Sequence, residues 1–510
     1  MNGRTYNFIR SLGAGYIAIA VNIAYTVASV PLALHYLGKE QFGLWALAQQ
    51  IMGYLMLLDL GVSSAVSRFI ADTKDEVNGG EYGSILLTGG TVFIAQGILI
   101  GIAGFFFSFF APILFSVPQH LAGDFTNVLT VITTLAGISV ALRTLGAPLW
   151  AFQRMDVSYG LGSLSLLTNL AVLWGGLHLG WGIYSFALAG IPAALLCPAI
   201  TLWVCWKSGF YPAARNWGRP HWPMFRRIFS FGQDVVWVAI GSHLVNASQI
   251  MILSRLAGLD IAATFAIGTK LFTMAQQFTA KIIESSAPGL TEMFVRGETA
   301  KFHVRFANVF VLSTLLATIG ASALMAGNTS FVSFWTSGSI QWSLFFDFAL
   351  AVLLLATSLS RCLISLFGIA GNMRPIRHIY FAEGALFIAL AFPAASYFGI
   401  GGLLTVSLVA HFAVNCILSF RASEKILNPI RPIIHCGFVS IAITLFIAIL
   451  SFFSINLALH PLAIFCRFAV LVGLAALLGW FYIFTASLRL EFVARALAGL
   501  NVLRKRLINC

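Results

Sequence analysis

Charged residues are scarce in this chain. Asp, Glu, Lys and Arg make up only 9% of its 510 residues, whereas 59% are hydrophobic and the mean hydropathy is +0.90. Soluble globular domains carry about 25% charged residues, so this composition excludes a soluble protein. Acidic residues are the rarer sign, with 17 against 30 basic ones, which gives a net charge of +13. We expect a protein that lies in a lipid bilayer.

Residue patterns for metal, disulfide or nucleotide chemistry are also lacking. The seven cysteines form no Cys-x-x-Cys pair and the ten histidines form no His-Glu-x-x-His motif, which excludes the common zinc and redox sites. No Gly-x-x-x-x-Gly-Lys-Ser/Thr loop is present, so the chain is predicted to have no ATPase of its own. We predict free thiols, no cofactor and no enzymatic activity.

Long apolar runs fill the chain instead. A helix needs about 20 apolar residues to cross roughly 30 Å of hydrocarbon, and about fourteen such runs are separated by short polar turns. They predict an all-α, multi-pass membrane protein. The expected spans are 11–36, 43–66, 83–111, 126–148, 158–178, 182–206, 230–253, 259–287, 305–326, 341–368, 377–398, 400–420, 433–455 and 461–487.

The basic residues indicate how the chain is oriented in the membrane. Cytoplasmic loops collect Lys and Arg, and with the N-terminus inside, 23 of the 30 basic residues fall on the cytoplasmic side. Only Lys39 and Arg255 fall on the outer side of the membrane. Both termini are therefore predicted to be cytoplasmic. This topology explains the positive net charge without a nucleic-acid partner, and it brings the basic loops to the phospholipid surface.

The sequence repeats itself at an offset of about 220 residues. Gly38 corresponds to Gly258, and Gly180-Trp181-Gly182 corresponds to Gly399-Ile400-Gly401. Six spans separate equivalent points, and an even number gives both copies the same orientation. We predict a first six-helix bundle, a basic cytoplasmic linker, a second six-helix bundle, and an appended helix pair with a basic tail. Their ranges are 1–206, 207–228, 229–431 and 432–510.

Two stretches resemble a known transporter superfamily. Residues 37–71 begin Leu-Gly-Lys-Glu-Gln-Phe-Gly-Leu-Trp-Ala-Leu and continue through Asp59 to Arg68. Residues 371–401 include Glu383. Both stretches are similar to helices of the bacterial O-antigen and exopolysaccharide flippases. These flippases are a branch of the multidrug/oligosaccharidyl-lipid/polysaccharide exporter superfamily, which also includes the MATE transporters and the lipid II flippases.

The resemblance implies a MATE-like fold and a substrate. The substrate is an oligosaccharide linked through pyrophosphate to a polyprenyl carrier, and it is moved from the cytoplasmic to the periplasmic leaflet of the bacterial inner membrane by alternating access. The energy source is left open: protons, sodium ions or the downstream polymerisation of the glycan could drive transport. An association with the polysaccharide polymerase and the chain-length machinery is also left open. A MATE-type cation antiporter and a lipid II-type flippase are the alternatives, and a membrane glycan polymerase is the remotest, because the outer loops are short.

A cationic stripe in the eighth predicted span suits a pyrophosphate. The stripe consists of Lys270, Gln277, Lys281 and Glu284, spaced by 7, 4 and 3 residues, which places them on one helix face. A lysine that faces lipid costs about 3 kcal/mol on insertion scales. We therefore expect the stripe to face a cleft or another helix. The alternative for Lys281 is snorkelling, or an ion pair with Glu284.

Arg143 and Arg361 occupy matching positions in the two copies, at an offset of 218. Guanidinium groups bind phosphate oxygens with two parallel hydrogen bonds. We therefore expect the two arginines to face each other across the cleft and to capture pyrophosphate from the cytoplasmic side. The alternative is that both snorkel to the inner membrane surface.

Further polar residues complete the candidate site. Two stripes at matching positions suit sugar hydroxyls or, alternatively, the packing of helices on one another. They are Asn22, Thr26 and Ser29 in the first copy, and Ser242, Asn246 and Gln249 in the second. Four charged residues are candidates for ion coupling or for buried structural contacts. These are Asp59, Arg68, Asp347 and Glu383.

Overall fold

The computed structural model describes residues 3–59, 62–152, 154–424, 431–454, 461–484 and 489 of the chain. Across these ranges the regular secondary structure is helical, with no strand, which confirms the predicted all-α fold. Helices form because a backbone in lipid must satisfy its own hydrogen bonds, and a helix does so within one segment.

Eleven of the described helices are long and apolar enough to cross a membrane. Two of these stretches, Gly13–Leu58 and Arg374–Ser423, contain 46 and 50 residues. At about 1.5 Å per residue, each is more than twice as long as the roughly 30 Å of hydrocarbon. The predicted eighth span, by contrast, is divided at Thr269 into two helices. The multi-pass architecture is confirmed, and the count of fourteen spans stays a prediction.

Glycines form corners at repeated positions in the chain. Gly38 in α1 (Gly3–Leu55) has φ 75° and ψ −179°. Gly258 has φ 89° and ψ 171°, and it separates α10 (Ser248–Ala257) from α11 (Leu259–Gly268). This backbone conformation is essentially restricted to glycine. The two glycines that the sequence aligns therefore make the same corner.

The described helices form two compact units. One holds residues 3–267 with 384–400, and the other holds 268–383 with 401–489. Besides α1, α10 and most of α11, the first unit contains α2 (Val62–Thr73), α3 (Glu81–Leu114), α4 (Gln119–Ala141), α5 (Ala147–Ala151), α6 (Met155–His178), α7 (Tyr184–Leu188), α8 (Cys197–Lys207) and α9 (Trp222–Asn246). These units are defined by contacts between residues, whereas the predicted six-helix bundles are defined by the sequence repeat. The predicted bundles therefore stay a prediction.

Two apolar clusters hold the first unit together. One joins α1, α3, α4 and α7 around Phe125, and the other joins α2, α3 and α9 around Tyr82. Helices α3 and α4 approach closely because a glycine of each faces the other. A methyl group on Gly97 would lie 2.3 Å from the carbonyl oxygen of Gly137.

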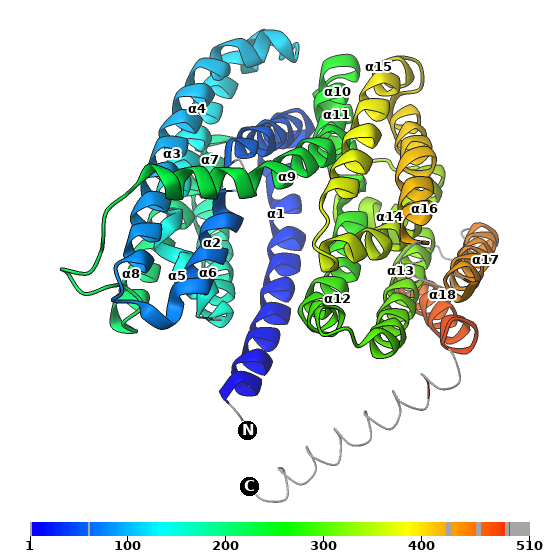
Figure 1. The fold of residues 1–510 in the computed structure, drawn as a ribbon. Coiled ribbons are helices and arrows are strands. Elements are labelled where there is room, and N and C mark those ends of the chain that lie inside the picture. The colour runs from blue at the N-terminus through cyan, green and yellow to red at the C-terminus, as the bar shows by residue number, and fades with distance from the viewer. Residues whose placement is uncertain are drawn as a thin grey trace, which may run out of the picture. The chain divides into compact units, whose positions relative to one another are not determined.

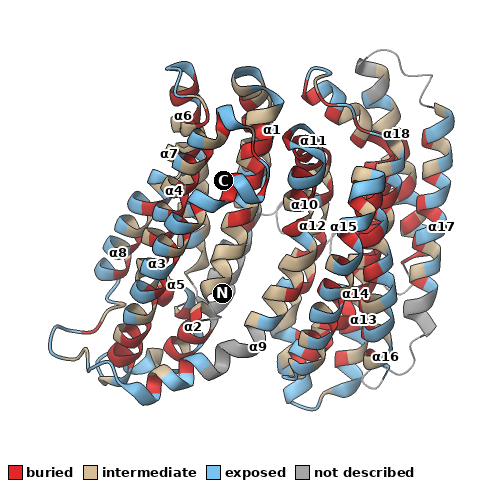
Figure 2. Cartoon of the chain, turned by 90° about the horizontal axis from the view of Figure 1, so that it is seen from above, coloured by how far each residue is buried: buried red, intermediate tan, exposed pale blue. Residues whose placement is uncertain are grey.

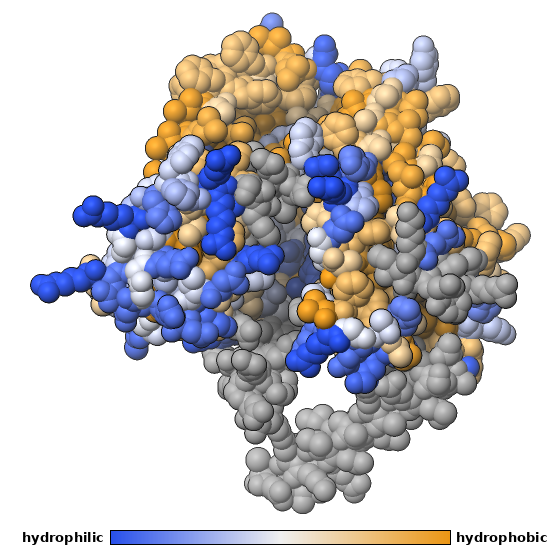
Figure 3. Space-filling view, in the orientation of Figure 1, coloured by the Kyte–Doolittle hydropathy of each residue, from blue (hydrophilic) through white to orange (hydrophobic). Residues whose placement is uncertain are grey.

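Hydrophilic side chains gather along the loop between α8 and α9 (Figure 3).

The second unit is built around α13 (Thr299–Trp335). Its other helices are α12 (Lys270–Val295), α14 (Leu344–Ile369), the ends of α15 (Arg374–Ala410), α16 (Ile417–Ser423), α17 (Arg431–Ser454) and α18 (Pro461–Tyr482). Helices α12, α14, α17 and α18 lie against α13 (Figure 1). Figure 2 shows that α13 and α14 are largely buried.

The appended pair, α17 and α18, is attached to α13 by two polar contacts. Ser451 Oγ donates to the carbonyl oxygen of Met325 at 2.7 Å, and Arg467 Nη2 donates to that of Ala326 at 2.7 Å. Gly327 leaves room for the Phe468 ring, since a methyl group there would come within 2.4 Å of it. The pair is therefore an integral layer of the second unit.

Candidate functional site

The predicted cationic stripe lies on a single helix, α12. Lys270 is its first residue and is half-buried, and no described side chain forms a hydrogen bond or ion pair with its ammonium group. Gln277 is exposed on the same helix. Lys281 Nζ lies 3.4 Å from Glu284 Oε2, so its charge is partly balanced within the stripe. Lys270 is the cation that lacks such compensation, at a helix end that already favours anions.

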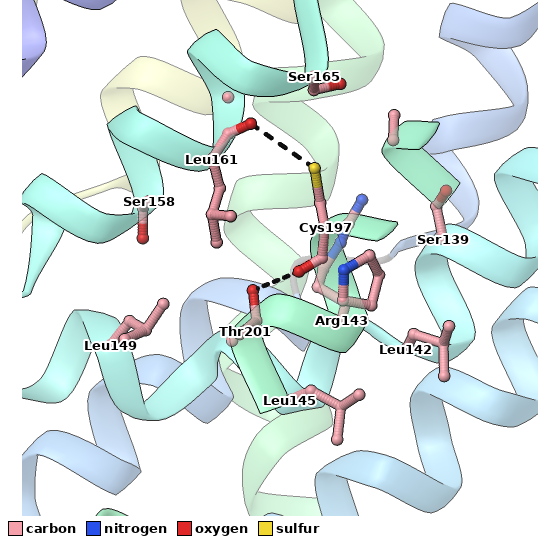
Figure 4. A pocket seen from close by; sticks show the side chains of 14 residues that line it. Ser139, Leu142, Arg143, Leu145, Leu149, Ser158, Leu161, Ser165, Cys197 and Thr201 are labelled. Atoms are coloured by element: carbon pink, nitrogen blue, oxygen red, sulfur yellow. Dashed lines mark hydrogen bonds between the residues drawn. The ribbon is translucent and has the colours of Figure 1, made fainter. Parts of the chain in front are cut away.

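Arg143 lines a cavity of about 330 Å³ in the first unit. It begins the 3₁₀ turn Arg143–Gly146 between α4 and α5, and its Nη1 donates to Ser63 Oγ at 3.0 Å. Figure 4 shows the side chains that line this cavity, among them four hydroxyls that sequence reasoning misses. They belong to Ser139, Ser158, Ser165 and Thr201. A guanidinium beside several hydroxyls suits a phosphorylated or sugar-bearing ligand.

The loop between α8 and α9 fixes the turn that carries Arg143. Tyr211 Oη donates to the carbonyl oxygen of Leu145 at 2.8 Å, within that turn. Tyr82 Oη of α3 donates to the carbonyl oxygen of Phe210 at 2.8 Å. Burial, with a smaller contribution from Cys205, raises the pKa of the Tyr211 phenol far above its ordinary value, so this hydrogen-bond donor keeps its proton.

Arg361 is exposed on α14, directly after the buried Ser360. It acts electrostatically on Tyr380 of α15. Because Arg361 belongs to the second unit and Arg143 to the first, their expected approach across a cleft stays a prediction.

A buried polar cluster lies within the second unit, between α14, α15 and the π-helical turn His411–Cys416. His411 Nδ1 donates to Glu383 Oε1 at 2.6 Å, and Asn415 Nδ2 donates to Glu383 Oε2 at 2.6 Å. His411 Nε2 lies 2.9 Å from Ser360 Oγ. All four side chains are at most 5% exposed. Sequence reasoning names Glu383 alone, although a polar pair four residues apart in an apolar helix is a usable signal.

Asp347 occupies a second buried polar cluster, near the start of α14. Its Oδ1 accepts from Asn328 Nδ2 at 2.6 Å and from Trp342 Nε1 at 2.7 Å. Its Oδ2 accepts from the backbone N–H and the hydroxyl of Thr329, at 3.0 and 2.6 Å. Asn328 Nδ2 also donates to the carbonyl oxygen of Gly268 at 3.0 Å. Four donors surround this carboxylate, which ties α13 and α14 to the α11–α12 junction.

Each of the two duplicated stripes has hydrogen bonds within its own helix. Thr26 Oγ1 donates to the Asn22 carbonyl oxygen at 2.9 Å, and Asn246 Nδ2 donates to that of Ser242 at 2.9 Å. Asn22 and Asn246 are exposed, whereas Gln249 is half-buried. The choice between a ligand-facing role and packing between helices stays a prediction. Arg68 is exposed on α2, and the side chain of Asp59 lies outside the described residues.

No three His, Cys, Asp or Glu side chains gather into a metal-binding group within the part of the chain that the structure describes. The cysteines described there have free thiols. The Lys, Arg, Glu and His side chains described above can bind ligands and exchange protons.

Residues 13–294 match the model of a family described as polysaccharide biosynthesis protein. A curated relative, the uncharacterized membrane protein EpsK of Bacillus subtilis (strain 168), is 22% identical over 347 residues. That alignment covers 66% of this chain and 66% of the relative. The chain thus spans just under two thirds of the length of this relative.

Two solved structures share the fold. An inward-facing multidrug resistance MATE transporter of the MOP superfamily gives a TM-score of 0.66 at 12% identity, over 79% of this chain and 94% of that one. The lipid II flippase MurJ, in an inward closed conformation, gives 0.67 at 13% identity, over 93% and 98%. At these identities the likeness shows the fold, and the predicted MATE-like architecture is confirmed.

Proposed function

Because this chain belongs to the polysaccharide biosynthesis family, we propose that it is a flippase for lipid-linked glycans. It moves a polyprenyl-pyrophosphate-linked oligosaccharide from the cytoplasmic to the periplasmic leaflet of the bacterial cytoplasmic membrane. The movement uses alternating access of the MATE-like fold and requires no covalent chemistry. The distribution of basic residues supports a cytoplasmic position for both termini.

The ammonium group of Lys270 supports this proposal most directly, because it is half-buried and has no partner among the described residues. A half-buried ammonium in an apolar protein loses hydration, and that loss is offset by an ion pair or a hydrogen bond. The Lys270 ammonium has neither among the described residues, and it stands at the first turn of α12. An anionic ligand supplies the missing partner. The pyrophosphate of a lipid-linked glycan is an anion of this kind at the border of the hydrocarbon.

The arginines support the same substrate. Arg143 brings a guanidinium and neighbouring hydroxyls to one cavity, and Arg361 exposes a second guanidinium in the other unit. Guanidinium groups bind phosphate oxygens well, and the hydroxyls suit the first sugar of the glycan. We assign Arg143 and Arg361 to capture of the pyrophosphate, and Asn22 and Asn246 to the sugar.

A MATE-type antiporter for organic cations is the less favoured function. Such a site offers acidic groups to its ligand, but Asp347 and Glu383 are both buried and already bonded to donors of the protein. Of the accessible charges described above, Glu284 pairs with Lys281, and the others are cationic. A lipid II-type flippase has the same chemistry as the proposed one, and only the identity of the glycan separates them.

Deletion of the gene in its own host tests the function. We expect lipid-linked oligosaccharide to accumulate in the cytoplasmic leaflet, with loss of the surface polysaccharide, and the full chain to restore both. Arg361→Ala and Arg143→Ala should lower export several-fold at normal expression. Arg296→Ala is the matched control, since Arg296 is exposed and pairs with Glu292 at 2.6 Å. Accumulation of lipid II instead would favour the lipid II-type function, and full export by Arg361→Ala would remove that residue from the site.

A further inference from the structure

The Glu383 cluster is a buried polar site that the proposed substrate contacts leave unused. Both carboxylate oxygens of Glu383 already have a donor at 2.6 Å, and the imidazole of His411 reaches Ser360 with its second nitrogen. The histidine lies in a π-helical turn, a feature that occurs often at functional sites.

The repeat shows that the fold does not require this cluster. A π-helical turn also occurs in the first copy, at Pro192–Leu196, and His411 follows Pro192 at the repeat offset of 219 (411 − 192). The same offset aligns Asn415 with Leu196. Glu383 falls on Leu164, or on Ser165 at the offset of 218. The same scaffold therefore forms with apolar or neutral residues at these positions.

The hydrogen bonds of the His411 imidazole and the Ser360 hydroxyl can be satisfied with and without one added proton. Ser360 Oγ lies 2.9 Å from His411 Nε2 and 3.3 Å from the Thr357 carbonyl oxygen. With a neutral imidazole, the hydroxyl donates to Nε2. With an imidazolium, Nε2–H donates to Ser360 Oγ, and the hydroxyl turns to the Thr357 carbonyl. The proton added at Nε2 changes the charge of the Glu383–His411 pair from −1 to zero and leaves both imidazole nitrogens and the Ser360 hydroxyl with a partner.

A proton fits this site better than a metal cation. Sodium binds through oxygen ligands, but the atoms that face Glu383 are the N–H donors of His411 and Asn415. At 2.6 Å these donors occupy the carboxylate oxygens and repel a cation. On its other side, the cluster borders a cavity of about 320 Å³ whose wall is apolar except for a few groups such as Ser360 and Cys416.

We propose that Glu383, His411, Asn415 and Ser360 form a proton-binding site that couples the flippase to a proton gradient. The site rests on the proposed function for its coupling role, but not for proton binding itself. The charged and titratable groups around the pair are Tyr380 of α15, Arg361 of α14, which acts on Tyr380, and Cys416 of the π-helical turn. The α13 and α17 residues on the cavity wall, such as Phe310 and Phe438, are not titratable.

Imidazole nitrogen NMR of the isotope-labelled full chain in liposomes tests proton binding directly. His411 is identified by the signal that His411→Gln removes. We expect an imidazolium at neutral pH in the wild type and a neutral imidazole in Glu383→Gln, whose amide still accepts from His411. Glu284→Gln is the control, because Glu284 is exposed and pairs with Lys281. An unchanged His411 signal in Glu383→Gln would overturn the proposal.

Flipping of polyprenyl pyrophosphate in proteoliposomes tests coupling. In the wild type, we expect a pH gradient to raise the initial rate and replacement of sodium by potassium to have no effect. The variant Glu383→Leu/His411→Leu/Asn415→Leu imitates the apolar first copy, and replacing a buried ion pair by apolar residues often preserves stability. Its ratio of rates with and without the gradient should fall to one. A ratio like that of the wild type contradicts the proton site, whereas a wild type that moves no probe contradicts the proposed function instead.

Discussion

The α-carbon of Gly43 lies against the carbonyl oxygen of Leu259, so closely that a methyl group on Gly43 would come within 2.1 Å of that oxygen. Gly43 follows the corner at Gly38, and Leu259 follows the corner at Gly258. The helices that follow the two equivalent corners are therefore in contact inside the first unit.

Gly43→Ala should destabilise the protein, because backbone cannot move away from the new methyl group as a flexible side chain would. Strain in a packed interior costs about 1–3 kcal/mol, and we expect a lower melting temperature of the detergent-solubilised protein. Gly101→Ala in α3 is the control. Nothing lies within 4 Å of a methyl group there, so the gain in helix propensity should leave the melting temperature equal or higher.

Lys270→Ala should weaken substrate binding more than Lys281→Ala. A hydrogen bond to a charged group is worth about 1.5–3 kcal/mol, so loss of Lys270 should lower affinity for polyprenyl pyrophosphate roughly 10- to 100-fold. Lys281 shares its charge with Glu284 at 3.4 Å, and its loss should have a smaller effect. Binding to the purified full chain, measured by calorimetry, checks this order. Equal effects of the two substitutions would show that the ion pair with Glu284 does not weaken the binding of the ligand by Lys281.

Trp342→Phe should destabilise the second unit. The substitution removes the indole N–H that donates to Asp347 Oδ1 at 2.7 Å but keeps an aromatic ring over Gly268. The expected cost is about 1.5–3 kcal/mol, because the acceptor is a buried carboxylate. Trp203→Phe is the control, because it makes the same substitution at a tryptophan that is 62% exposed. Thermal unfolding of the two variants should separate them clearly, and equal melting temperatures would exclude a stabilising role for the Asp347 cluster.

Tyr211→Phe should show the contribution of the loop that fixes the Arg143 turn. The raised pKa of the Tyr211 phenol means that the unfolded chain loses this proton first, as pH rises above about 10. The stability from this group is thus fully present below that pH and is lost above it. The variant should lose about 1 kcal/mol near neutral pH and less of its remaining stability than the wild type at alkaline pH. Tyr36→Phe, at an exposed position, serves as the control in melting curves at both pH values.

The sequence predicts the helical fold well, because hydropathy is a local signal, and the repeat pairs the glycines that prove to form corners. Gly38 and Gly258 share one backbone conformation, as their alignment implies. The polar clusters are harder to predict. Glu383 meets His411 and Asn415 only because α15 and the following π-helical turn are folded together. The cavity beside Arg143 likewise combines hydroxyls from α4, α6 and α8, and no spacing along a single helix reveals such a set.

The position of α13 also determines the order in which the protein is assembled. Ser451 and Arg467 complete the surroundings of Met325 and Ala326, yet α17 begins 96 residues after α13 ends (431 − 335). During synthesis, that side of α13 is therefore exposed to lipid until α17 and α18 are inserted. A chain cut before α17 would remain an unfinished intermediate, with a polar, glycine-containing helix face open to the bilayer and to membrane proteases.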